Sequence, residues 1–151
     1  MPEVSEVALT AEILLKHLKN KTLVAFDFVA GRFSKKSPPG FDDFIDALPL
    51  KVVDINSKGK FMWFDLVEPK NKKNHWYIWN TYGLNGMWSM TEPKYLKAIL
   101  TFTGNKVAYF SDLRNFGTFK FGSSKEDLDK KLKELGPDFL NEDFDLDIIT
   151  K

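Results

Sequence analysis

Apolar residues recur at spacings of three and four from the very start of the chain, at Val4, Val7, Ala11, Leu14 and Leu18. This period places them on one face of a helix, which we predict over residues 3–18. A second helix is predicted over residues 123–135, because Ser124 precedes Asp127 by three positions in a capping pattern and Gly136-Pro137 can end the element.

Short runs of β-forming residues fill the chain between these helices. They predict strands over residues 22–29, 51–55, 60–67, 75–79, 86–90, 96–102, 106–110 and 117–121. The connections are predicted as a basic loop with two prolines (32–40), a short helix (41–48), a hairpin connection (56–59) and a polar turn (68–74). This order indicates a mainly β (α+β) fold, an antiparallel β-sandwich of about eight strands flanked by an N-terminal and a C-terminal helix.

Composition excludes several classes of protein. The chain has 151 residues, which suits one domain, and it contains no cysteine, so disulfides and cysteine-based metal sites are excluded. His17 and His75 are its only histidines, and we therefore expect no structural zinc site, no other metal and no cofactor. The sequence has no apolar run long enough for a membrane span and no signal-peptide pattern, which predicts a soluble intracellular protein that is not secreted.

Charge is distributed unevenly along the chain. The formal net charge is only +1, but five acids and a single base lie beyond residue 137. The first 137 residues hold 21 bases against 16 acids, a net charge of +5. This mildly basic body permits a phosphate-binding face. Arginine occurs only twice, at Arg32 and Arg114, so the surroundings of each arginine are of interest.

The opening residues, MPEVSEV, carry candidate chemistry at the chain terminus itself. Removal of the initiator methionine would leave Pro2 with a free secondary amine, a nucleophile that forms an iminium with an aldehyde-like carbon. The positive end of a helix dipole and partial burial both favour the neutral amine, and Glu3 beside it can serve as a general acid or base. Proline and acidic residues also favour an ordinary helix start, so these residues alone leave both interpretations open.

Five segments in order along the chain carry a family resemblance. Besides MPEVSEV they are SKGKFMWFDL (57–66), NTYGLNGMW (80–88), SDLRNFGTFKF (111–121) and LGPDFL (135–140). In turn they resemble the MPELPEV opening, the lysine-bearing hairpin, the HLGMSG loop, the DPRRFG loop and the LGPEPL segment of the Fpg/Nei family, the formamidopyrimidine-DNA glycosylases and endonuclease VIII proteins. The resemblance spans essentially the whole chain. In their detailed sequence, the five segments are most similar to the endonuclease VIII-like enzymes of giant DNA viruses.

The resemblance implies a bifunctional DNA glycosylase and apurinic/apyrimidinic lyase of base excision repair, which removes oxidised pyrimidines and ring-opened purines by β,δ-elimination. It implies Pro2 as the nucleophile on the sugar carbon, Glu3 as the proton donor to the sugar ring and Glu6 as a residue that orients the site. Lys60 is implied to contact DNA near the lesion and to take part in catalysis. Lys58 is a candidate phosphate contact, and a plain solvated surface charge is the alternative for Lys58 and for Glu6.

An enzyme that extrudes a nucleotide from a duplex must fill the hole that it leaves. The family does this with three residues on two loops, which map here to Leu84, Arg114 and Phe116. Taken alone, Leu84 and Phe116 suit a hydrophobic core better than a DNA contact, whereas Arg114 is unusual in a chain whose bases are mostly lysine. Asn115 stands where the family usually has a second arginine, so we expect a weaker DNA contact at that position.

The resemblance also implies a domain organisation. Residues 1–137 are expected to form the catalytic β-sandwich domain, and residues 138–151 an acidic linker toward a helix–two-turn–helix and finger domain that these residues do not include. The family places double-stranded DNA with oxidised bases or abasic sites between the two domains. We expect a monomer without membrane contacts. Ser5 and Leu113 each replace a proline of the family motifs, so the local backbone is expected to differ there.

Two other classes of protein fit parts of the sequence. A domain that binds damaged DNA without catalysis fits if Met1 is retained, because Pro2 then has no free amine. An aromatic-rich β-sandwich that binds a carbohydrate or a protein fits the 15% aromatic content but not the five ordered segments. Trapping of an iminium separates the first alternative from the enzyme, and dependence of DNA binding on Arg114 tests the second.

Overall fold

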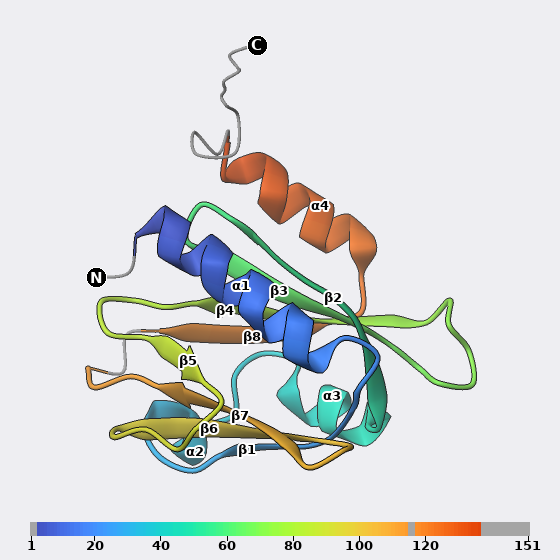
Figure 1. Cartoon of the computed structure of the whole chain (residues 1–151). Helices are drawn as coiled ribbons and strands as arrows, with labels where there is room; N and C mark the ends of the chain where they lie inside the picture. The colour runs from blue at the N-terminus through green and yellow to red at the C-terminus, as the bar shows by residue number, and fades with distance from the viewer. Residues whose placement is uncertain (1–2, 115–116, 137–151) are drawn as a thin grey trace.

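A computed structural model describes residues 3–114 and 117–136 of the chain (Figure 1). Its strands are β1 (Thr22–Phe28), β2 (Leu50–Lys58), β3 (Phe61–Val67), β4 (His75–Thr81), β5 (Met87–Ser89), β6 (Leu96–Phe102), β7 (Lys106–Ser111) and β8 (Thr118–Gly122). Its helices are α1 (Val4–Leu18), α2 (Arg32–Lys35), α3 (Phe41–Ala47) and α4 (Lys125–Glu134). The predicted order of helix, eight strands and helix is confirmed, as is the short helix predicted over residues 41–48, which is α3. Helix α2 is a further helical turn between β1 and α3.

The eight strands form one antiparallel sheet in the order β5-β7-β6-β1-β2-β3-β4-β8. β1 and β2 pair only through Thr22 with Lys51 and Leu23 with Leu50, which is a narrow join in the middle of the sheet. On either side of this join the strands separate into two layers, β5-β7-β6-β1 and β2-β3-β4-β8 (Figure 1). The predicted sandwich is therefore present as a single sheet that folds over on itself.

Aromatic side chains hold the two layers together. Phe26 of β1 packs edge-on against Phe119 and Phe121 of β8, with ring centroids 5.8 and 5.3 Å apart. Phe110 of β7 lies 5.1 Å from Phe119 in the same edge-on geometry, which is a favourable arrangement for aromatic rings. These contacts join one layer to the outermost strand of the other, and they account for much of the phenylalanine in the sequence.

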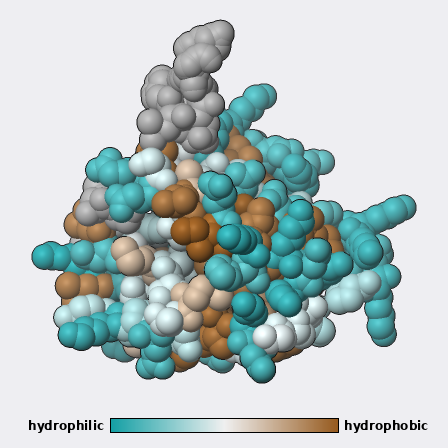
Figure 2. Space-filling view, viewed as in Figure 1, coloured by the Kyte–Doolittle hydropathy of each residue, from teal (hydrophilic) through white to brown (hydrophobic). Residues whose placement is uncertain are grey.

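Helix α1 packs its apolar face against β2 and β3 of the sandwich (Figure 1). Its buried residues belong to the face predicted from the sequence: Val7, Ala11, Leu14 and Leu18. The opposite face includes the exposed side chains of Leu9 and Ile13, and brown hydrophobic side chains are visible among teal ones along this part of the surface (Figure 2).

Helix α4 packs on the outer face of β3 and β4 and closes a second, smaller core. That core consists of Phe61, Tyr77 and Leu128, with Trp63, Trp79 and Leu132 packed around it. Burial there, with the negative charges of Asp65 and Asp129 nearby, raises the pKa of Tyr77 to about 12. The predicted cap is confirmed, because the backbone N–H of Asp127 donates to the Ser124 Oγ at 3.1 Å.

Two local predictions were wrong. Part of the expected loop over residues 32–40 is the helical turn α2, closed by a hydrogen bond from the Lys36 N–H to the Arg32 carbonyl. β2 continues to Lys58, which pairs with Phe61, so the hairpin turns at Gly59 and Lys60 and not over residues 56–59. Lys60 therefore lies in the turn instead of opening a strand, because cross-strand pairing extends β2 beyond its apolar run.

We predict that Phe26→Ala lowers the free energy of unfolding by about 3–5 kcal/mol, because it leaves a cavity between the layers. Val24→Ala on the same strand is the matched control: Val24 is 46% exposed, and we expect it to cost less than about 1 kcal/mol. Denaturant unfolding of both variants measures the difference. Equal losses would contradict the assignment of Phe26 as the contact between layers.

Candidate nucleic-acid interface

Three connections of the sheet meet at one row of residues. Thr81 of β4 pairs with Phe61 of β3 on one side and with Thr118 of β8 on the other, and the hydroxyl oxygens of Thr81 and Thr118 lie 2.6 Å apart. The β2–β3 turn, the β4–β5 connection and the described ends of the β7–β8 connection therefore leave the sheet beside one another. The start of α1 lies at the same end of the sandwich (Figure 1). We call this end the loop edge.

Glu3 and Glu6 form the start of α1. The N–H of Glu3, the N-cap residue, donates to Glu6 Oε1 at 3.0 Å, and the Glu3 carbonyl accepts the N–H of Val7 at 3.0 Å. Glu6 thus fixes the peptide group that directly follows Pro2, and both glutamates are exposed at the positive end of the helix dipole. Pro2 itself lies outside the described residues.

Tyr82 anchors the connection that carries Leu84. Its side chain is buried, and its hydroxyl donates to the Met62 sulfur at 3.3 Å. Burial raises the pKa of Tyr82 well above its usual value, opposed in part by an interaction with Thr10 of α1, so the hydroxyl remains a neutral donor. The hydrogen bond to Met62 thereby ties the connection to β3 of the sheet.

The turn that follows Tyr82 is too tight for any residue but glycine at its end. The Gly86 N–H donates to the Tyr82 carbonyl at 2.8 Å, and a Cβ on Gly86 would lie only 2.1 Å from that oxygen. Leu84 sits between these two residues and is 45% exposed. The closed turn therefore presents an apolar side chain to solvent on a fixed backbone.

The connection that carries Arg114 is fixed at both ends. Asp112 is buried, and its Oδ2 accepts the N–H of Gly117 at 2.7 Å, while the Gly117 carbonyl accepts a hydrogen bond from Arg32 Nη2 at 2.5 Å. A Cβ on Gly117 would lie 2.9 Å from both Asp112 Oδ2 and the Thr81 carbonyl oxygen. Arg114 is exposed between these supports. Asn115 and Phe116 lie outside the described residues.

The two hairpin lysines occupy different environments. Lys60 lies in the turn at the loop edge, next to Phe61 of the shared row. Lys58 Nζ donates to the carbonyl of Leu132 in α4 at 2.7 Å. Lys58 therefore fastens α4 to the hairpin, and any contact between Lys58 and phosphate, which stays a prediction, must compete with this hydrogen bond.

Sequence reasoning missed the buried polar residues that support these connections. Asn80 has no exposed surface; its Nδ2 donates to the Thr118 carbonyl at 3.2 Å, and its Oδ1 accepts the indole N–H of Trp88 at 2.9 Å. Buried Asp112 supports the Arg114 connection in the same way. Arg32, of interest in the sequence as one of two arginines, adds a hydrogen bond from an exposed side chain. The signal was available in Asn80 and Asp112, because each is a polar residue at the end of an apolar strand, next to a glycine-bearing connection.

The connections that carry Lys60, Leu84 and Arg114 thus leave the sheet from one row of paired residues. The start of α1, which includes Glu3 and Glu6, lies at the same end of the sandwich (Figure 1). Residues 3–114 and 117–136 contain no group of three or more histidine and carboxylate side chains placed to hold a metal ion. In the same part of the chain, every helix is too short or too polar to cross a membrane.

The family follows from comparison with known proteins. The model of the formamidopyrimidine-DNA glycosylase N-terminal domain matches residues 1–119, and the chain belongs to this family. Over its full length the chain is 28% identical to the formamidopyrimidine-DNA glycosylase of Shouchella clausii, of which it covers 54%, and 22% identical to that of Corynebacterium glutamicum, of which it covers 56%. The chain therefore spans about half the length of the curated relatives that it matches.

Solved structures share the fold. One is a complex between the Lactococcus lactis Fpg and an abasic site containing DNA, with a TM-score of 0.70 and 18% identity over 88% of this chain and 48% of that chain. Another is wild-type Lactococcus lactis Fpg with a N7-benzyl-Fapy-dG containing DNA, with a TM-score of 0.70 and 19% identity over the same shares. At these identities the similarity establishes the arrangement of the strands and helices.

We predict that Asp112→Ala loosens the Arg114 connection, because it leaves the buried N–H of Gly117 without its acceptor. The expected loss in the free energy of unfolding is about 1–3 kcal/mol. Faster hydrogen exchange at the Gly117 amide is the direct measurement. Asp27→Ala is the control, since Asp27 is exposed on β1. Unchanged exchange at Gly117 in the Asp112 variant would show that this carboxylate does not hold the connection.

Proposed function

We propose that this chain is the catalytic domain of a bifunctional DNA glycosylase and apurinic/apyrimidinic lyase of base excision repair. It acts inside the cell on double-stranded DNA that contains oxidised bases or abasic sites. The observation that carries this proposal is the meeting, at the loop edge, of the start of α1 with Lys60, Leu84 and Arg114 from three separate connections. Membership of the formamidopyrimidine-DNA glycosylase N-terminal domain family supports it.

The reaction begins at the chain terminus. With Met1 removed, the lone pair of the Pro2 nitrogen attacks C1′ of the damaged nucleotide, and the bond from C1′ to the base breaks. The proton that the proline nitrogen gives up goes to the departing base. Glu3 gives a proton to the ring oxygen, and the sugar opens to an iminium between C1′ and the proline nitrogen. Loss of a C2′ proton then expels the 3′ phosphate, and a further elimination expels the 5′ phosphate.

Glu6 acts as a positioning residue in this scheme. Its carboxylate accepts the N–H of Glu3, the peptide group that joins Glu3 to Pro2, so the nucleophile and the acid keep one orientation. Lys60 in the adjoining turn supplies a positive charge for a phosphate beside the lesion. These two roles need no metal and no cofactor.

Leu84 and Arg114, with Phe116, fill the space that the extruded nucleotide leaves. Leu84 and Phe116 act as apolar wedges, and the guanidinium of Arg114 pairs with the base left opposite the hole. The closed turn at Gly86 and the double support at Gly117 favour this role, because a wedge must enter the stack without folding back. We further propose the substrate preference of the endonuclease VIII-like branch, oxidised pyrimidines and ring-opened purines.

A second function is binding of damaged DNA without catalysis. The chain spans about half the length of its curated relatives, and the resemblance implies that DNA lies between this domain and a further one, so residues 1–151 by themselves would supply one side of the DNA-binding surface. Leu84 and Arg114 would still engage a distorted duplex. The two functions differ in one property, which is formation of a covalent bond to Pro2.

Borohydride trapping on abasic-site duplex DNA tests the nucleophile. We expect Met1-free protein to form a covalent adduct located at Pro2, and a two-residue N-terminal extension to reduce its yield by more than about 100-fold, since the terminal secondary amine is then lost. Intact mass gives the state of Met1 in the same sample. Equal yields from the two proteins would contradict attack by the Pro2 amine. DNA binding without an adduct from Met1-free protein would favour the second function.

Glu3→Gln separates base removal from strand cleavage. We expect base excision to fall by about 10²–10⁴-fold, and cleavage of a preformed abasic site to fall much less, because that substrate already offers an aldehyde. Glu12→Gln is the matched control, since Glu12 is an exposed glutamate on the same helix. Single-turnover rates on the two substrates give the comparison. An equal loss on both substrates would remove Glu3 from the role of proton donor.

A further inference from the structure

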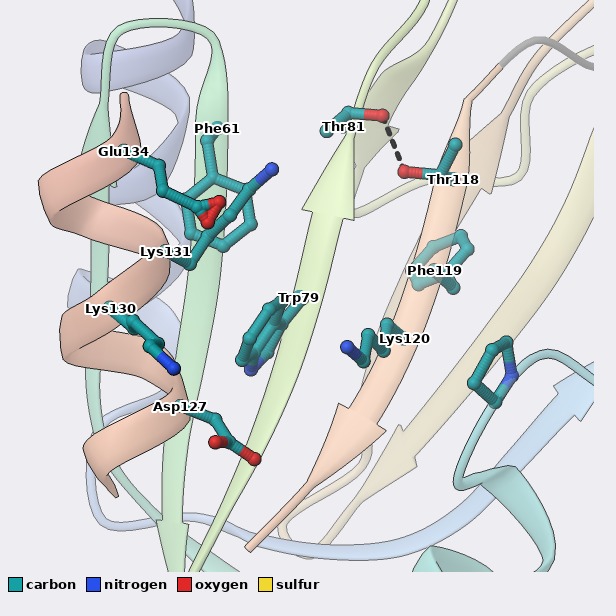
Figure 3. Close-up of a pocket in the computed structure, with 11 residues that line it drawn as sticks. Phe61, Trp79, Thr81, Thr118, Phe119, Lys120, Asp127, Lys130, Lys131 and Glu134 are labelled. Atoms are coloured by element: carbon teal, nitrogen blue, oxygen red, sulfur yellow. Dashed lines mark hydrogen bonds between the residues drawn. The ribbon is translucent and has the colours of Figure 1, made fainter. Parts of the chain in front are cut away.

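A groove of about 610 Å³ lies between α4 and the outer face of β3, β4 and β8 (Figure 3). Its lining includes Phe61, Thr81 and Thr118. These three residues form the row at which the connections of the loop edge leave the sheet. The groove therefore opens directly beside the loop edge but contains none of the residues assigned to catalysis or to filling the stack. Its volume is typical of a site for a molecule of nucleotide size.

Three lysines converge on this groove from two sides. Lys120 extends from β8, and Lys130 and Lys131 extend from α4 (Figure 3). Asp127 and Glu134 also line the groove, yet none of the three lysines forms an ion pair with a described residue. Their charges are available to an anion, and the lining carries a net charge of +1.

Trp79 gives the groove a second feature that a ligand could use. Its ring lies on the floor, with Lys120 Nζ 4.7 Å from the ring centroid. Its indole nitrogen is buried and has no hydrogen-bond acceptor among the described residues. A buried donor without an acceptor costs free energy, and an oxygen of a bound ligand would recover it. The paired hydroxyls of Thr81 and Thr118 add polar groups at the end of the groove that meets the loop edge.

We propose that this groove binds a short single-stranded segment of nucleic acid, with phosphates toward the lysines and an unpaired base against Trp79. Lysines beside an aromatic ring are the combination with which proteins hold single strands without reading sequence. The volume of the groove suits a nucleotide of a single strand, and a single strand offers the unpaired base that would contact Trp79. The choice of nucleic acid rests on the proposed function, because the groove continues the surface on which that function places DNA.

Fluorescence anisotropy with a labelled pentamer of deoxythymidylate tests the groove in the full chain at low salt. We expect Lys120→Gln with Lys130→Gln to weaken binding by about fivefold or more, because two phosphate contacts are lost. Lys72→Gln with Lys73→Gln is the matched control: it removes the same charge from the β3–β4 connection, the teal projection far from the loop edge in Figure 2. We expect less than about a twofold effect there.

Trp79→Phe keeps a ring but removes the unpaired donor, and we expect binding about two- to fivefold weaker than in the unchanged chain. Equal weakening by the two double-lysine variants would overturn the proposal in favour of general charge attraction. Displacement of the pentamer by hexaglutamate as readily as by unlabelled pentamer would overturn it in favour of an acidic-peptide groove.

Borohydride trapping on a blunt abasic-site duplex keeps the two proposals apart. The Lys120/Lys130 variant should give the adduct yield of the unchanged chain, because a blunt duplex offers no single-stranded segment to the groove. Pentamer binding that needs these lysines, without any adduct, would support the groove and count against the lyase. An adduct together with pentamer binding that ignores these lysines would support the lyase and overturn the groove.

Discussion

The side-chain amide of Asn80 ties together the strands on which the loop edge depends. It is fully buried, it donates to the Thr118 carbonyl of β8, and it accepts the indole N–H of Trp88 in β5. A buried amide that loses these partners is costly, so β4, β5 and β8 are held in one relative position. The row of Phe61, Thr81 and Thr118 follows from this register, and the spacing of the connections follows from the row.

The supports and the exposed side chains of the loop edge have divided roles. Tyr82, Asp112 and Gly117 are buried and hydrogen-bonded, and they fix the backbone close to its points of attachment. Leu84 and Arg114 are exposed within the connections that these residues fix. A side chain that must enter a base stack needs a backbone that resists the push, and rigid supports from the sheet supply this resistance. Function at such an edge therefore depends on residues that need not contact a ligand.

Whether a feature could be predicted depends on how far apart in the sequence the residues that determine it lie. The buried face of α1 and the Ser124 cap are local patterns, and both predictions were confirmed. The hairpin turn was misplaced because its position depends on pairing between Lys58 and Phe61, which apolar spacing does not reveal. The candidate residues came from short motifs, whereas the contact of Asn80 with Thr118 joins residues 38 positions apart. Long-range polar support is thus the part that sequence pattern alone could not supply.

The layer β2-β3-β4-β8 uses its two faces for different purposes, and this explains why a groove adjoins the loop edge. Its inner face carries Phe119 and Phe121, which close the sandwich against Phe26. Its outer face needs only α4 as a cover, and this helix is fastened by a small core and by the hydrogen bond from Lys58 to Leu132. A ten-residue helix cannot cover the outer face completely, so Trp79 and Lys120 are left at the floor of a hollow. The groove ends at Thr81 and Thr118, whose hydroxyl pair joins β4 to β8. A nucleic-acid strand bound in the groove would therefore meet the loop edge at this hydroxyl pair.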